Sequence, residues 1–167
     1  MNILFVCTHN RCRSILCEAI ANHLNSPHLQ GHSAGSQPVG EVHPLSLKFL
    51  AEKGIHTDGL HSKSWEQFSD QQPDLVITVC DSAAGESCPL WMGKSLKFHW
   101  GLADPSKLEG SEDQLRSAFF AVIDCIQNRL KALIEANLQA DDPAALKQTL
   151  TRIAQQFPAP DFEQEAR

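Results

Sequence analysis

Hydrophobic positions along the chain fall into short continuous runs and longer stretches with helical spacing. The segments that predict strands are residues 3–6, 29–33, 74–80 and 96–100, of which 29–33 is the weakest and 74–80 is rich in β-branched residues. The stretches that predict helices are residues 14–24, 44–53, 112–136 and 142–156. Strands that alternate with helices indicate a parallel sheet between helices, so the pattern predicts an α/β fold.

The remaining segments are polar or rich in turn residues. Residues 81–93 are predicted to form a loop. Asp142 and Pro143 begin the last predicted helix as its N-cap and first helical residue. After Phe157, prolines at 158 and 160 predict a frayed tail.

Composition narrows the class of protein. The chain has 167 residues, with 14 Lys and Arg against 20 Asp and Glu, and a net charge of −6. This acidic balance argues against a nucleic-acid partner, because phosphate backbones attract basic surfaces. No apolar run approaches the roughly 20 residues of a membrane span. The apolar N-terminal segment lacks a basic start and a small-residue cleavage site, so we expect a cytoplasmic protein.

The chain contains six cysteines. In a cytoplasmic protein, cysteines more often serve catalysis, metal binding or the core than structural disulfides. No Cys-x2-Cys pair is present, and His99 is the one extra ligand type near Cys80 and Cys88, so we predict no metal site.

Residues 7–14, Cys-Thr-His-Asn-Arg-Cys-Arg-Ser, join the first predicted strand to the first predicted helix. Backbone N–H groups at a helix N-terminus can face an anion, and the same field stabilises a thiolate, so we expect Cys7 to be an ionised nucleophile. Arg13 can bind a tetrahedral oxyanion through two parallel hydrogen bonds, and Ser14 can donate to the Cys7 sulfur. Asn10 tolerates a left-handed backbone and can tie the loop together through its amide. The predicted oxyanion-binding residues are Thr8, His9, Asn10, Arg11, Cys12 and Arg13.

The Cys-x5-Arg-Ser spacing of this loop resembles the low-molecular-weight protein tyrosine phosphatase superfamily, and more narrowly its arsenate reductases. The segments that carry the resemblance are Cys7 to Ser14, Ser33-Ala34-Gly35, Val79-Cys80-Asp81 through Cys88-Pro89, and His99-Trp100-Gly101 leading to Asp104-Pro105. The resemblance implies a four-stranded parallel sheet flanked by helices, with Cys7 attacking the oxyanion and Asp104 acting as general acid. It extends to about residue 135, so we divide the chain into a phosphatase-like catalytic domain at 1–140 and a C-terminal helical extension and tail at 141–167.

Within this superfamily, arsenate reduction differs from phosphoester hydrolysis in needing two electrons. Cys80 ends the third predicted strand at the sheet edge expected for Cys7, so it can attack the Cys7 sulfur after arsenic has been added. Cys88 can then form a disulfide with Cys80, which thioredoxin would reduce; glutathione and glutaredoxin could serve if the relay stops at Cys80. We expect no bound cofactor, with arsenate as substrate and phosphate or sulfate as analogues.

Other interpretations stay open at this point. A phosphatase needs only Cys7, Arg13 and an acid, so Cys80 would be dispensable. Cys80 and Cys88 would then be a core thiol and a chance loop thiol. A third interpretation is a noncatalytic oxyanion-sensing or redox-sensing module that binds phosphate or arsenate and turns over neither.

The absence of tyrosine favours a small inorganic substrate. Tyrosine phosphatases of the family usually have tyrosine just after the Asp-Pro, where it contacts the phosphotyrosine ring. Here Ser106 and Lys107 follow Asp104-Pro105. Arsenate is small and needs no aromatic slot.

Four supporting residues follow from the same resemblance. Asn10, Glu18 and Ser33 match positions that hold a potassium ion in some thioredoxin-linked arsenate reductases. The further carboxylate of that site falls at Lys63, so we predict that the Lys63 ammonium replaces the ion beside Glu18 and makes activity independent of potassium. The alternative is a solvated surface lysine.

The other loop and helix residues have simpler expectations. Cys12 is expected to pack within the loop, with an auxiliary thiol role as the alternative. Cys17 and Cys125 fall in helical patterns and are expected in the core. His9 and Arg11 either attract oxyanions or are exposed without a partner.

Overall fold

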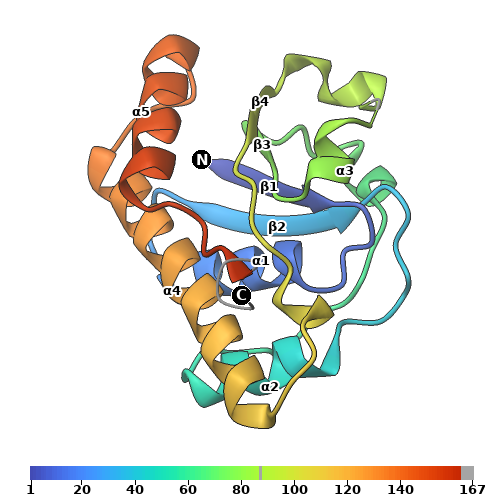
Figure 1. Ribbon diagram of the computed structural model, residues 1–167. Helices are drawn as coiled ribbons and strands as arrows, with labels where there is room; N and C mark the ends of the chain where they lie inside the picture. The colour runs from blue at the N-terminus through green and yellow to red at the C-terminus, as the bar shows by residue number, and fades with distance from the viewer. Residues whose placement is uncertain (87, 163–167) are drawn as a thin grey trace.

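A computed structural model describes residues 1–86 and 88–162 (Figure 1). Within these residues, four parallel strands form one sheet in the order β2-β1-β3-β4. In chain order, with 3-10 helices labelled η, the elements are β1 (Asn2–Cys7), α1 (Arg13–His23), β2 (Gln30–Gly35), α2 (Pro44–Glu52), η1 (Trp65–Phe68), β3 (Leu75–Thr78), α3 (Asp81–Ala84), η2 (Leu90–Lys94), β4 (Leu96–His99), η3 (Pro105–Lys107), α4 (Glu112–Ala136) and α5 (Pro143–Gln156). The predicted α/β class is confirmed, and the predicted strands and helices are found with ends shifted by at most two residues.

The central strand β1 explains where the site forms. It pairs with β2 on one side and β3 on the other, and residues 3–6 are each at most 1% exposed, as their continuous apolar run predicts. The carboxyl ends of parallel strands lie at one edge of a sheet, so the residues that end or follow β1 and β3 come together there. That edge carries Cys7 and Cys80.

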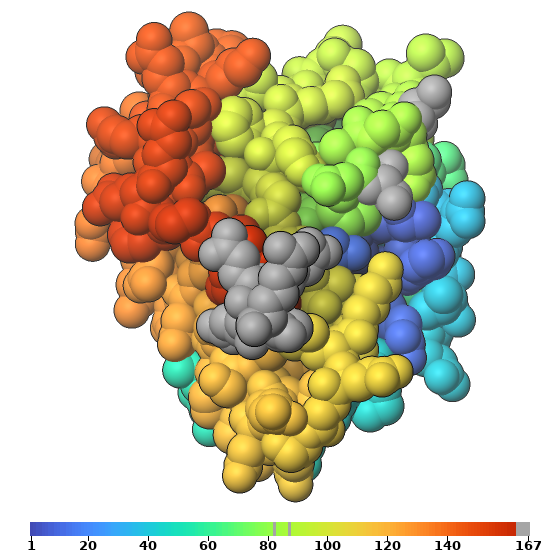
Figure 2. Space-filling view, in the orientation of Figure 1, coloured from blue at the N-terminus to red at the C-terminus, as the bar shows by residue number. Residues whose placement is uncertain are grey.

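Helices cover the sheet. Figure 1 shows α1 and α4 below β1 and β2, with the short α3 above them, and Figure 2 shows α5 (red) beside α4 (orange). Side chains from α4 and α5, among them Phe119, Ile123 and Leu150, share one hydrophobic core with the strands. Among the helices of the described ranges, none combines the length and the hydropathy that crossing a bilayer requires.

Two segments differ from their predictions. The predicted loop 81–93 contains α3 and most of η2, because Ala83 and Met92, at 2% and 0% exposure, anchor it in the core. The predicted fraying is wrong for residues 158–162: Phe162 is only 9% exposed, and the Phe157 carbonyl just before them accepts a hydrogen bond from Arg129 Nε at 2.9 Å. Ser87 and residues 163–167, which belong to the predicted loop and tail, lie outside the described residues.

Candidate active site

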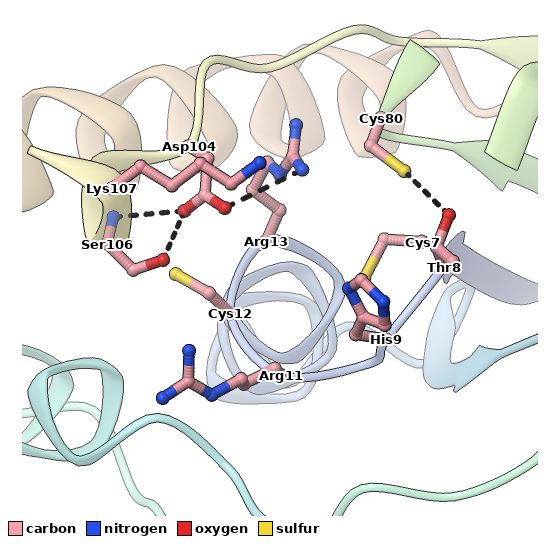
Figure 3. Close-up of a pocket in the computed structure, with 10 residues that line it drawn as sticks. All are labelled: Cys7, Thr8, His9, Arg11, Cys12, Arg13, Cys80, Asp104, Ser106 and Lys107. Carbon is pink, nitrogen blue, oxygen red and sulfur yellow. Dashed lines mark hydrogen bonds and ion pairs between the residues drawn. The ribbon is translucent and has the colours of Figure 1, made fainter. Parts of the chain in front are cut away.

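The segment between β1 and α1 curls around a pocket at the carboxyl edge of the sheet (Figure 3). Three of its carbonyls are held outward by backbone N–H groups: Thr8 O by Gln37 (2.8 Å), His9 O by Val39 (3.3 Å) and Arg11 O by His43 (2.9 Å). The amides of residues 9–14 donate no hydrogen bond within residues 1–86 and 88–162. They therefore remain available for an oxyanion in the concave centre of the loop.

Asn10 and Gly35 give this loop its shape. Asn10 has a left-handed backbone with φ 47°, and its Oδ1 accepts a hydrogen bond from the Lys63 backbone N–H at 2.9 Å. Its Nδ2 donates to Ser14 Oγ at 2.8 Å and to Ser33 Oγ at 3.0 Å, so the predicted conformation and the predicted amide tie are confirmed. A Cβ atom at Gly35 would lie 2.6 Å from Thr8 O, so only glycine lets β2 approach the loop this closely.

The Cys7 sulfur lies within this hydrogen-bond network. Cys7 is 5% exposed, and its Sγ is 2.8 Å from Ser14 Oγ. Since Ser14 Oγ already accepts a hydrogen bond from the Asn10 amide, its own proton is directed to the sulfur. The sulfur–hydroxyl contact expected from the sequence is therefore present, with the hydroxyl oriented toward Cys7.

Arg13 and Asp104 lie next to each other in the pocket and form an ion pair. Arg13 donates from Nη1 to the Leu102 carbonyl at 2.9 Å, and its Nη2 is 3.7 Å from Asp104 Oδ2. Asp104 Oδ1 accepts hydrogen bonds from the backbone N–H of Ser106, at 2.9 Å, and from the Ser106 hydroxyl. The guanidinium and the carboxyl are therefore both positioned before any anion binds, as Figure 3 shows.

Cys80 belongs to the same pocket, and Cys88 does not. Cys80 is 4% exposed, and its Sγ lies 3.8 Å from Thr8 Oγ1 and accepts a hydrogen bond from the Ala83 N–H at 3.4 Å. Cys88 is exposed and lines a separate cavity together with Ala83, Ala84 and residues of β3 and β4. The two thiols therefore line different cavities, which have no lining residue in common.

The pocket has the size and charge for a small anion. Its volume is about 180 Å³, and its lining residues are Cys7, Thr8, His9, Arg11, Cys12, Arg13, Cys80, Asp104, Ser106 and Lys107. Three of these carry permanent positive charge, in a chain whose net charge is −6. A thiol, a loop with unpaired backbone amides and a carboxyl group in one pocket are the groups that group transfer at a tetrahedral oxyanion needs.

Comparison with known proteins agrees with this geometry. The family model for low molecular weight phosphotyrosine protein phosphatase matches residues 2–144. The chain belongs to this family. An arsenate reductase from Halalkalibacterium halodurans is 35% identical to this chain over 133 residues, which are 80% of this chain and 94% of that protein.

Two solved structures resemble this chain in fold as well as in sequence. An arsenate reductase in the phosphate binding state is 28% identical, with a TM-score of 0.65, and the match covers 82% of this chain and 98% of that one. A thioredoxin-dependent arsenate reductase from Corynebacterium glutamicum is 29% identical, with a TM-score of 0.60, and the match covers 81% of this chain and 61% of that one. The expected low-molecular-weight phosphatase fold is thereby confirmed.

Two pocket residues, Ser106 and Lys107, and one neighbour of the pocket, Glu86, were not among the predicted site residues. Ser106 binds the Asp104 carboxyl, and Lys107 lines the pocket beside it. Glu86 accepts a hydrogen bond from Thr8 Oγ1 at 2.8 Å. The Asp-x-Ser spacing is typical of a turn in which the aspartate binds the backbone two residues on, so it could have identified Ser106. Glu86 reaches Thr8 only through the conformation of residues 81–86, for which the sequence carries no comparable signal.

The three remaining buried cysteines are held as neutral thiols. Burial, with a further contribution from Asp104, raises the pKa of Cys12 to about 12. Burial also raises the pKa of Cys17 and, with less effect, that of Cys125. Cys17 and Cys125 lie in the core as predicted, at 2% and 8% exposure. Cys12 is 4% exposed and touches the pocket, while His9 and Arg11 are exposed at its rim.

Lys63 is buried beside Glu18. Its Nζ is 3.2 Å from Glu18 Oε1 and donates to the His61 carbonyl at 3.1 Å and to Ser33 Oγ at 3.4 Å. Glu18 Oε1 also accepts the Ser33 N–H at 3.1 Å. Lys63 is 7% exposed, so it is not a solvated surface lysine. The internal ammonium thus lies against Glu18 and Ser33, with Asn10 bound to its backbone.

His43 links the stability of the site to pH. Its Nδ1 caps α2 by accepting the Leu45 N–H at 3.1 Å, and its backbone N–H holds Arg11 O. Burial lowers the pKa of His43, and the Arg11 charge lowers it further. The neutral cap is therefore fully stabilising above about pH 6.5, the ordinary pKa of histidine. Its contribution is lost as the pH falls through the lowered value.

We predict that His43→Asn flattens this pH dependence, since asparagine caps a helix and does not titrate. Between about pH 7 and pH 5, the free energy of unfolding should fall less in the variant than in the unsubstituted protein. Urea unfolding at both pH values measures the difference. An equal fall in the two proteins would show that the cap does not titrate as argued.

Proposed function

We propose that this protein reduces arsenate to arsenite through a covalent adduct on Cys7 and an intramolecular disulfide. The observation that carries the proposal is the presence of two thiols, Cys7 and Cys80, at one oxyanion-sized pocket that also contains Arg13 and Asp104. Two proteins that are 35% and 28% identical to this chain are named arsenate reductases, which supports arsenate as the substrate.

The first step is nucleophilic attack by the Cys7 thiolate on arsenic. A Cys7 sulfur–arsenic bond forms and one arsenic–oxygen bond breaks. Asp104 donates a proton to the departing hydroxyl group of arsenate, which leaves as water. Arg13 and the amides of residues 9–14 bind the remaining oxygens, while the Ser14 hydroxyl stabilises the thiolate before attack.

The second step is attack by the Cys80 thiolate on the Cys7 sulfur. A Cys7–Cys80 disulfide forms, and the electron pair of the sulfur–arsenic bond stays with arsenic, which is reduced from the +5 to the +3 state and leaves as arsenite. Cys88 then attacks Cys80 and regenerates the Cys7 thiolate, leaving a Cys80–Cys88 disulfide. Because Cys80 is buried and Cys88 is exposed, this exchange carries the oxidised pair toward the surface.

Thioredoxin is the proposed reductant of that disulfide. The support is the exposure of Cys88 and the likeness to a thioredoxin-dependent arsenate reductase. Glutathione with glutaredoxin is the alternative donor if the relay stops at Cys80.

The test is arsenate-dependent oxidation of NADPH, coupled in separate assays to thioredoxin and to glutaredoxin. We expect turnover with the thioredoxin system. Turnover with glutaredoxin alone would contradict the proposed reductant, and no turnover with either would overturn the proposed reduction. Aryl-phosphate hydrolysis is measured in parallel, since Cys7, Arg13 and Asp104 together satisfy the needs of a phosphatase. Phosphate binding without either reaction would indicate a noncatalytic oxyanion sensor.

A further inference from the structure

The C-terminal part of the chain, residues 143–162, lies almost wholly beyond the family match, which ends at residue 144. The solved arsenate reductase in the phosphate binding state is 98% covered by only 82% of this chain. We call residues 143–162 the C-terminal extension. In Figure 1 the red segment after α5 runs back across α4 toward the middle of the molecule.

The extension touches the start of the segment that carries Asp104. We call residues 100–108 the acid loop. Its first residue, Trp100, is 4% exposed, and its indole N–H donates to the Leu150 carbonyl in α5 at 3.1 Å. Arg129 in α4 also contacts Trp100, since its guanidinium lies 5.4 Å from the centre of the Trp100 ring. The same guanidinium donates to the Phe157 carbonyl of the extension at 2.9 Å. Trp100 is thereby held by α4 and by the extension together.

The extension also reaches the other end of the acid loop. Pro160 and Phe162 line one cavity with Leu108, the last residue of the loop, and with Ala118 of α4. Phe162 is 9% exposed and belongs to the hydrophobic core, against which Leu108 packs. The part of the chain that the family match lacks is therefore hydrogen-bonded to one end of the acid loop and shares a cavity with the other.

Between these ends lie the groups that approach the reacting atoms. The Leu102 carbonyl holds Arg13, and Asp104 lies 3.7 Å from the same guanidinium. A displacement of either end would move the carboxyl relative to the Cys7 sulfur, and group transfer is sensitive to displacements of this kind. We infer that the C-terminal extension is a positioning element that clamps both ends of the acid loop and so aligns Asp104 with substrate. The inference rests on the proposed arsenate reduction for its kinetic readout.

The test combines two clamp variants with removal of the acid. Trp100→Phe keeps the ring over Arg129 and loses the hydrogen bond to α5, and Phe162→Ala loosens the other end. We expect each to lower kcat for arsenate about 3- to 10-fold with little change in KM, and Asp104→Asn to lower kcat about 100-fold. In the Asp104→Asn background, the two clamp variants should cause a clearly smaller loss, because the carboxyl that they align is gone and only the Leu102 contact to Arg13 remains.

Leu29→Ala is the matched control. Leu29 is 6% exposed and adjoins the amino end of β2, away from the acid loop. The destabilisation caused by Leu29→Ala should change kcat by the same factor in the unsubstituted protein and in the Asp104→Asn variant. If Phe162→Ala and Trp100→Phe behave like this control, with equal losses in both backgrounds, the clamp is overturned.

Hydrogen exchange separates failure of the clamp from failure of the proposed function. The amides of Leu102, Ser106 and Leu108 are all hydrogen-bonded in the resting protein. Faster exchange at these amides in both clamp variants, and not in Leu29→Ala, would support the clamp even without arsenate turnover. Unchanged exchange would overturn it whether or not the protein reduces arsenate.

Discussion

Cys80→Ser is expected to lower steady-state arsenate reduction about 1,000-fold or more, because without a second nucleophile the electron pair of the sulfur–arsenic bond has no route to arsenic. The geometry that supports this expectation is local. Cys80 Sγ lies 3.8 Å from the hydroxyl of Thr8, the residue directly after Cys7, and both thiols line the pocket. Coupled NADPH oxidation gives the rate, and a single-turnover assay measures arsenite release.

Cys125→Ser provides the matched control. Cys125 is also buried, at 8% exposure, but its sulfur contacts the carbonyls of Phe157 and Pro158 rather than the pocket. This variant should keep nearly full turnover. Full arsenate turnover by Cys80→Ser would show that Cys80 is not the second thiol and that the proposed two-thiol step is wrong.

Cys88→Ser tests the third thiol separately. It should still release arsenite in a single turnover, since Cys7 and Cys80 are both present. Thioredoxin-coupled turnover should then stop, because the remaining disulfide joins Cys7 and Cys80, which are only 5% and 4% exposed. If this variant turns over with glutathione and the unsubstituted protein needs the same donor, the relay is limited to two thiols.

The parts of this fold that the sequence predicted are those with a strong local signal. The apolar run 3–6 is buried on both faces of the sheet, and the 25-residue helix α4 begins and ends where its periodicity predicts. The loop at residues 7–14 could also be predicted in detail, because a left-handed Asn10 and an inward Ser14 follow from its strand-to-helix connection.

The parts that were missed depend on contacts between distant segments. The α3 helix has four residues, too few to show a helical period in the sequence. Residues 158–162 look like a free proline-containing tail, and only their packing against α4 and the acid loop reveals their burial. Glu86 and Arg129 likewise acquire their partners through tertiary structure, at separations of 78 and 28 residues.

The buried ion pair between Lys63 and Glu18 leads to the largest predicted effect on stability. Lys63→Met should lower the free energy of unfolding by about 3–5 kcal/mol, because it leaves the Glu18 carboxylate buried without its cation. Urea unfolding measures the change. The double variant Lys63→Met/Glu18→Gln should recover part of it, since removing both charges costs less than leaving one.

The exposed pair of Lys53 and Asp124, 2.8 Å apart, supplies the matched control: Lys53→Met should lower the free energy of unfolding by less than about 1 kcal/mol, as loss of a surface ion pair does.

The buried Lys63 ammonium also predicts how the protein responds to potassium. Lys63 Nζ already contacts Glu18, Ser33 and the His61 carbonyl, so an added cation gains no site there. Exchange of sodium for potassium at constant ionic strength should therefore change neither Tm nor turnover, whereas strong activation by potassium would contradict the role assigned to Lys63.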